Sequence, residues 1–174
     1  MIDKLLAEQP LEDKFSHLLE ILEKEVNLFN EFLTLLQRER QYMIDLSLDK
    51  LHECHNQKET IVLNLKVLED ARADLISEIH DDNQTTTTTL SMIIDKAPAR
   101  YKNGMESCQS NLRSLVDSIR EINQINGILA DRAINYTRNS LSFLNRLISQ
   151  LPVYHASGRM VHENKTGTLV CKKG

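Results

Sequence analysis

The residues of this sequence best suited to metal chemistry are His52, Cys54 and His55, because imidazole and thiolate are good zinc ligands. On a helix, however, residues one or two positions apart point to different faces, which counts against a shared ion. Glu59 lies four positions after His55 and would share its face, but this adds up to only two ligands. We therefore predict ordinary surface and interface roles for these residues, and no metal site.

The remaining histidines stand apart from any arrangement of Ser, Cys and Asp that would activate a nucleophile. The five glycines are dispersed, so they form no glycine-rich phosphate loop. These observations predict no catalytic residues, no cofactor and a protein that is not an enzyme.

Amide side chains are the second group with a chemical role to assign. Asn123 and Asn126 are three residues apart, which makes them neighbours on a helix, and Asn126 falls on an apolar seam. A seam asparagine lowers stability but selects the register and number of partner helices. The other interpretation is that these amides bond the backbone or side chains of a bound helix. The sequence leaves both open.

The seam belongs to a long helix predicted over residues ~105–151, a stretch with no proline and one glycine, Gly127. Its apolar residues recur at alternating intervals of three and four, the heptad spacing of helices that pack along their length. From Ile134 onward a second apolar set widens the apolar arc from about 60° to about 160°. That set is Ile134, Leu141, Leu144, Ile148 and Leu151. It is either a wider internal core or a face for an amphipathic helix of another protein.

Two further helices are predicted over residues ~10–45 and ~48–80, with Pro10 in the first turn of the former. The segment 45–49 contains two aspartates and Ser47, side chains that favour turns and caps, so we predict a helical hairpin with Ser47 as N-cap. Lys58, Leu65 and Arg72 lie on the seam of the second helix as structural residues. A turn near Ser47 would bring Arg72 level with Glu23 and Glu25, where an ion pair would fix the register.

The stretch 81–104 interrupts the helical pattern with a run of five threonines, Thr85 to Thr89. The apolar residues Leu90, Ile93 and Ile94 could still form a short helix that closes one end of the bundle. The predicted fold is all-α: an elongated antiparallel helical bundle or coiled coil of three long helices with a short helical or irregular connection. We expect a single domain over residues 1–158 and a flexible tail over 159–174.

The composition of the chain argues against several classes of binding partner. The 174 residues carry a formal charge of -4 without a basic block, which argues against nucleic acid and an anionic membrane surface. Apolar runs are only a few residues long, and the N-terminus lacks the apolar core of a signal peptide, so we expect no membrane insertion. Three scattered cysteines indicate a reducing compartment. Together these features predict a cytoplasmic protein.

The order and spacing of these segments resemble the FlgN family of flagellar export chaperones. The similarity rests on the Leu-rich first helix, the Lys58 to Arg72 segment, and Asn123 and Asn126 followed by a Leu/Ile-rich stretch, with Tyr154 and Gly158 beyond it. It extends over roughly residues 10–158, and the polythreonine segment matches no pattern of the family.

The resemblance implies a cytosolic helical chaperone without cofactors. It implies binding of the C-terminal helices of hook-filament junction (hook-associated) proteins, prevention of their premature assembly, and delivery to the flagellar export gate, by a monomer or weak homodimer. Client binding is implied for the C-terminal helix. The candidate client-binding residues are Asn123, Asn126, Ile134, Tyr136, Leu141, Leu144, Ile148 and Leu151.

Two other classes stay open: a self-associating structural coiled coil or adaptor, and a regulatory scaffold of a histidine phosphotransfer chain. The second would need an exposed helical histidine, for which His52 and His55 are the central candidates.

Overall fold

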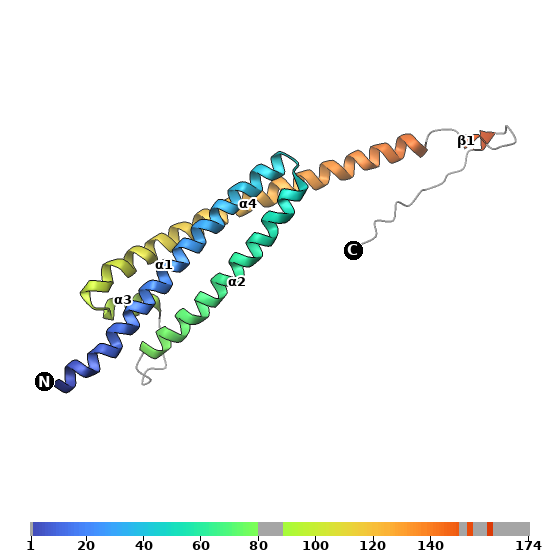
Figure 1. Ribbon diagram of the computed structural model, residues 1–174. Helices are drawn as coiled ribbons and strands as arrows, with labels where there is room; N and C mark the ends of the chain where they lie inside the picture. Colours follow the sequence, from blue (N-terminus) through green and yellow to red (C-terminus); the bar gives the residue numbers. More distant parts are fainter. Residues whose placement is uncertain (1, 80–88, 150–152, 155–159, 162–174) are drawn as a thin grey trace. The chain divides into compact units, whose positions relative to one another are not determined.

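The computed structural model describes residues 2–79, 89–149, 153–154 and 160–161. Four helices carry most of the described chain: α1 (Ile2–Ile44), α2 (Leu48–Ile79), α3 (Leu90–Lys96) and α4 (Ala99–Ser149). Two strands of two residues, β1 (Val153–Tyr154) and β2 (Met160–Val161), follow. The prediction of a helical fold is confirmed. The short helix α3 lies in the connection between α2 and α4 (Figure 1).

The chain divides into two compact units, residues 1–127 and 128–174. The boundary falls within α4. The expected single domain over residues 1–158 stays a prediction. Most of the expected tail, residues 159–174, and most of the polythreonine run lie outside the described residues.

The α1–α2 hairpin turns where the sequence predicts it. The N–H of Leu46 donates to the Met43 carbonyl at 3.3 Å, and the N–H of Ser47 to the Tyr42 carbonyl at 3.0 Å, the two bonds of a Schellman cap. Leu46 adopts a left-handed backbone with φ 53°, as this cap requires. Ser47 then precedes the first residue of α2 and its carbonyl accepts from Leu51 N–H at 3.0 Å, which confirms its position as N-cap.

Two predicted helix starts are wrong. α1 begins at Ile2 rather than near residue 10, so Pro10 lies inside the helix and not in its first turn. The residues before it, 3–9, are mostly strong helix formers, which explains why the helix continues through the proline. α4 begins at Ala99 rather than near residue 105, because the Pro98 carbonyl accepts from the N–H groups of Tyr101 and Lys102 at 2.9 and 3.1 Å.

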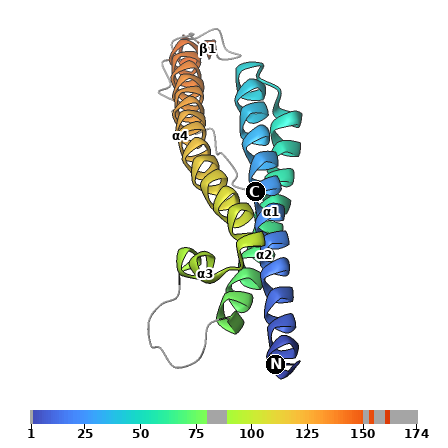
Figure 2. The ribbon, with the colours of Figure 1, turned by 90° about the vertical axis from the view of Figure 1, so that its left-hand side faces the viewer.

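The main core of residues 1–127 forms where α3 meets α1 and α4. A Cβ placed on Gly104 of α4 would lie 3.2 Å from Cδ1 of Leu19, so the two helices approach closely here. Partly buried residues of α2, among them Leu75 and Ile79, complete this core. The short helix α3 therefore closes one end of the bundle, as Leu90, Ile93 and Ile94 predict (Figure 2). The buried side chains are Phe15, Leu18, Leu22, Ile93, Ile94, Tyr101, Met105 and Cys108.

In the second unit, α4 runs from Ile128 to Ser149, and β1 pairs with β2 in antiparallel register, Val153 opposite Val161 and Tyr154 opposite Met160. Met160 and Val161 belong to the segment for which the sequence predicts a flexible tail, so a strand pair replaces part of that tail.

Replacing Leu46 with glycine should raise the free energy of unfolding by about 1 kcal/mol. The left-handed conformation places Cβ too close to a carbonyl oxygen, and glycine has no Cβ. The Leu46 side chain is 77% exposed, so little packing is lost. Thermal unfolding followed by circular dichroism measures the change. Leu48→Gly, at an equally exposed position within α2, is the control and should lower stability, whereas a Leu46→Gly protein less stable than wild type would contradict the assignment.

Candidate functional site

The C-terminal part of α4 displays the largest concentration of exposed apolar side chains in the described chain. We call these residues the C-terminal face. Their exposed fractions run from 46% for Leu147 to 77% for Tyr136. The C-terminal face consists of Ile134, Tyr136, Leu141, Phe143, Leu144, Leu147 and Ile148.

The C-terminal face covers about half of the helix circumference, since successive residues are about 100° apart. Polar side chains occupy the opposite half. They are Asn135, Arg138, Asn139, Ser142, Asn145 and Arg146. The helix is thus strongly amphipathic over residues 134–148, and its apolar half is open to solvent.

The residues of the heptad seam are more buried in the earlier part of α4. Met105 and Cys108 are buried, and the following seam residues up to Leu129 are half-buried, apart from the buried Asn126. From Ala133 onward the seam residues are exposed or, at Ser140, half-buried. The alternation of three and four therefore continues through both units, whereas burial stops near the boundary between them.

Asn126 lies inside the first unit. It is 4% exposed, and its Nδ2 donates to the carbonyl of Leu36 at 2.9 Å and to Oε2 of Glu39 at 3.1 Å. Oε1 of Glu39 accepts a hydrogen bond from Nζ of Lys58, so one carboxylate of α1 connects α2 with α4. The Asn126 amide is thereby engaged within the bundle, as the register interpretation of a seam asparagine predicts. Asn123, one turn earlier, is exposed.

The predicted pairing of Arg72 with Glu25 is present. Arg72 Nε lies 2.9 Å from Oε1 of Glu25, whose residue is 3% exposed. Leu65, midway between Lys58 and Arg72 on the seam of α2, is half-buried. The seam of α2 therefore carries two cations, each paired with a glutamate of α1.

Leu151 lies outside the described residues. Of the candidate client-binding residues, Ile134, Tyr136, Leu141, Leu144 and Ile148 are brought together on the exposed half of α4. The sequence prediction omits Phe143 and Leu147 from the binding surface, although both lie on the same heptad seam as Tyr136. Their exposure now places them beside Tyr136.

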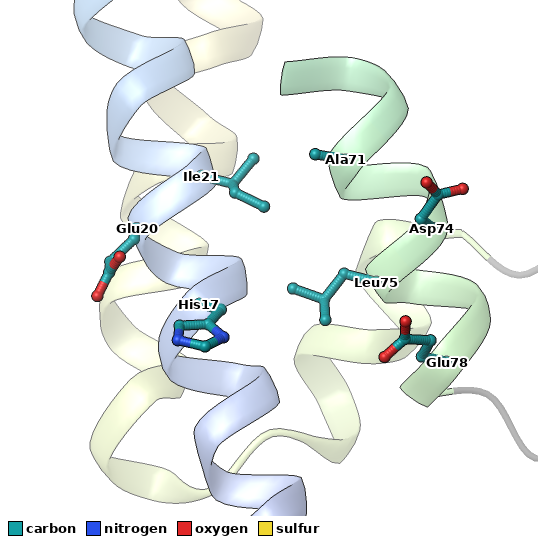
Figure 3. Close-up of a pocket in the computed structure, with 7 residues that line it drawn as sticks. All are labelled: His17, Glu20, Ile21, Ala71, Asp74, Leu75 and Glu78. Atoms are coloured by element: carbon teal, nitrogen blue, oxygen red, sulfur yellow. The ribbon is translucent and has the colours of Figure 1, made fainter. Parts of the chain in front are cut away.

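A shallow hollow of about 410 Å³ lies between α1 and α2 (Figure 3). Ile21 and Leu75 point toward each other across it, while the carboxylates of Glu20, Asp74 and Glu78 lie at its margin. Glu78 Oε2 is 3.4 Å from Nζ of Lys14. The hollow is an open stretch of the interface between the two helices and brings together no nucleophile and base.

The candidate metal ligands do not converge. Cys54 is buried, its thiol lies 3.5 Å from the carbonyl of Leu35, and burial raises the pKa of that thiol. A raised pKa disfavours the thiolate that zinc binds. His55 Nε2 lies 3.4 Å from Oε1 of Glu59, the i,i+4 neighbour expected from the sequence. Among the described residues, no group of three or more His, Cys, Asp or Glu side chains is arranged to hold a metal ion.

The helices in the described part of the chain include none that combines the length and apolar character needed to cross a membrane.

A family model, described as FlgN protein, matches residues 14–162. No curated protein and no solved structure matches the chain.

Replacing Arg72 with alanine should lower the free energy of unfolding by about 2–3 kcal/mol, because it leaves the buried Glu25 carboxylate without its partner. This corresponds to a decrease in Tm of roughly 5–10 °C for a chain of this size. The double variant Glu25→Leu/Arg72→Met should recover most of the loss, since it removes both charges. Unchanged stability together with weakened binding of a client would contradict a structural role for Arg72.

Asn126→Leu should raise the free energy of unfolding by about 1 kcal/mol. The change removes a buried amide whose Oδ1 has no hydrogen-bond partner among the described residues, while Glu39 keeps Lys58. Without the amide, the seam should select the number of packed helices less strictly. The variant should then self-associate, so that its molecular mass in solution rises with protein concentration. Asn123→Leu, at the exposed neighbouring position, is the matched control. An Asn126→Leu protein that is less stable than wild type would show that the amide contributes net stability.

Proposed function

Because the chain belongs to the FlgN family, a family of flagellar export chaperones, we propose that it is a cytoplasmic chaperone for hook-filament junction proteins. It binds their C-terminal helical segments, prevents premature assembly and delivers them to the export apparatus. The observation that carries this proposal is the C-terminal face, because seven large apolar side chains on half of one helix are left exposed.

The mode of binding that fits this face is packing of client helices along α4. Residues 134–148 rise about 20 Å, the length of a four-turn partner helix. The residues of the face recur at intervals of three, four and seven. An amphipathic helix carries its own apolar contact residues at the same intervals. A client held in this way has its own apolar face covered and is unavailable for pairing with other subunits.

The free energy available from this burial fits reversible binding. Removing seven half-exposed side chains from water contributes on the order of 5–10 kcal/mol at about 25 cal/mol per Å². Ordering of the client and loss of its free motion offset a large part of that gain. The remainder is a few kcal/mol, which corresponds to a weak, reversible complex that contacts at the export gate could displace.

A second candidate function is self-association as a structural coiled coil or adaptor. Exposed Val62, Leu63 and Val67 on α2, together with an open groove of about 560 Å³ lined also by Phe32 and His55, favour it. In that case the C-terminal face would be covered by a second copy, and the mass in solution would increase with protein concentration.

Titration calorimetry with the last ~40 residues of the host's hook-filament junction protein separates these functions, since this length accommodates a stable client helix. Saturable 1:1 binding with a negative heat-capacity change is expected for apolar docking. Absence of binding by a folded, self-associating chain would favour the structural coiled coil.

Leu144→Asp combined with Ile148→Asp should reduce client affinity by at least about 100-fold, because two carboxylates would have to be buried beneath the client helix. Helicity by circular dichroism should be nearly unchanged, since both side chains are at least half exposed.

The matched control is Asn135→Asp combined with Asn139→Asp. It introduces the same two charges at the same four-residue spacing on the opposite half of the helix. It should bind the client about as well as wild type. If Leu144→Asp/Ile148→Asp unfolds the protein while the control does not, the face is part of the folded core and the proposal fails.

A further inference from the structure

The C-terminal face consists of two stripes rather than one. Ile134, Leu141 and Ile148 recur at intervals of seven and form an aliphatic stripe. Tyr136 and Phe143 also lie seven apart, and with Leu147 they form a stripe that contains both aromatic residues of the face. At 100° per residue the centres of the two stripes are about 140° apart, with Leu144 between them.

This separation exceeds what one packed helix covers, because the apolar stripe that faces a neighbouring helix is about 100° wide. A helix seated on the aliphatic stripe would leave Tyr136 and Phe143 exposed. A helix seated on the aromatic stripe would leave Ile134 and Leu141 exposed. Covering the whole face requires two helices that lie side by side, with Leu144 beneath their junction.

An arginine borders each stripe on its outer side. Arg138 follows Ile134 by four residues and precedes Leu141 by three, so it lies at the edge of the aliphatic stripe. Arg132 precedes Tyr136 by four residues and lies at the edge of the aromatic stripe. Both side chains are exposed. At these positions they would meet the outer edges of the two covering helices, as charged residues flank a coiled-coil seam.

Asp131, directly before Arg132, is the one carboxylate near these cations in the sequence, since no acidic residue occurs between Asp131 and Glu163. The formal charge of -4 for the whole chain conceals an uneven distribution. Residues 128–174 contain seven Lys or Arg and two Asp or Glu, which gives a formal charge of +5. Residues 1–127 contain 14 Lys or Arg and 23 Asp or Glu, which gives a formal charge of -9. The surface that lacks a partner is thus cationic at its edges.

From these features, and resting on the proposed chaperone function, we propose that the C-terminal face binds two helices of one partner side by side. Each helix carries carboxylates along its outer edge, one set facing Arg132 and the other facing Arg138. The partner is therefore an acidic helical hairpin or helix pair, and charge contributes to selection among clients whose apolar faces are similar.

Two other occupants fit the surface less well. A helix that lies on an anionic membrane has a polar face rich in Lys and Arg, whereas the polar half here is mostly Asn and Ser. A second copy of this chain offers the exposed residues of α2, but Val62, Leu63 and Val67 extend over only six residues, much less than the length of the C-terminal face.

The test uses the full chain and designed probes, so that it does not depend on the identity of the client. One probe is a single amphipathic helix of about 18 residues with glutamates along both edges, four to five turns long. A second probe joins two such helices in a hairpin. A third is the same hairpin with lysine in place of each edge glutamate.

Calorimetry should show two equivalents of the single helix bound per chain but one equivalent of the hairpin, with the hairpin at least about 100-fold tighter because its second helix binds intramolecularly. Ile134→Asp/Leu141→Asp and Tyr136→Asp/Phe143→Asp should each reduce the single-helix stoichiometry from two to one. The lysine-edged hairpin should bind about tenfold more weakly at low salt, and the difference should shrink at about 1 M salt. Arg132→Gln/Arg138→Gln should remove most of that difference.

One equivalent of the single helix, lost entirely in either pair of stripe variants, would overturn the two-helix arrangement. Equal affinity for the two hairpins would overturn the role of charge. Binding to vesicles of mixed neutral and anionic phospholipid, without binding of any probe, would reassign the face to a membrane surface. A dimer that dissociates in the stripe variants would reassign it to a second copy.

The hook-filament junction peptide separates this inference from the proposed function. A chain that binds the acidic hairpin but not the junction peptide would retain the inference and lose the proposed client. A chain that binds the junction peptide through one stripe only, independently of salt, would retain the function and overturn the inference.

Discussion

The carboxylate of Glu39 is the contact on which the arrangement of the first unit depends. One of its oxygens accepts from Lys58 of α2 and the other from Asn126 of α4, so a single side chain of α1 joins three helices. The charge-assisted bond from Lys58 contributes about 1.5–3 kcal/mol, whereas the Asn126 amide selects the register at a cost in stability. Sliding any of the three helices by one turn would separate these groups. Apolar seams alone penalise such a slip less, because one leucine can replace another.

The sequence predicts the parts of this structure that follow from local chemistry. The turn at Ser47 and the heptad seam of α2 together bring Arg72 level with Glu25, and the structure contains that pair. The role of Glu39 could not be derived in the same way. Its contact with Asn126 joins residues 87 positions apart, and the long connection between α2 and α4 does not specify how the helices align. Two helix starts also differ from the prediction: α1 continues through Pro10, since proline disfavours a helix interior without forbidding it, and α4 begins directly after Pro98, within the predicted interruption over 81–104.

The spacing of apolar residues shows which face of a helix is apolar, but it does not show which other element covers that face. The seam of α4 has the same three-four alternation on both sides of Gly127, yet Met105 is buried and Phe143 is 59% exposed. The signal that could have separated the two is the second apolar set from Ile134 onward, because a helix apolar over half its circumference needs more than one neighbour. The sequence shows that this apolar surface requires more than one neighbouring helix. Whether another part of the same chain covers it depends on the tertiary structure.

The two kinds of seam also differ in how strictly they specify a partner. Within the first unit, each interface of α1 contains a polar contact that holds one register: Lys58 and Arg72 toward α2, and Asn126 toward α4. The centre of the C-terminal face has no such group, because the positions between its stripes are Thr137, Leu144 and the small residues Ala133 and Ser140. A surface without a buried polar anchor accepts several registers and several apolar sequences at similar cost. This property suits a chaperone that receives more than one client, and under the proposed charge selection the arginines at the edges of the face would discriminate among them.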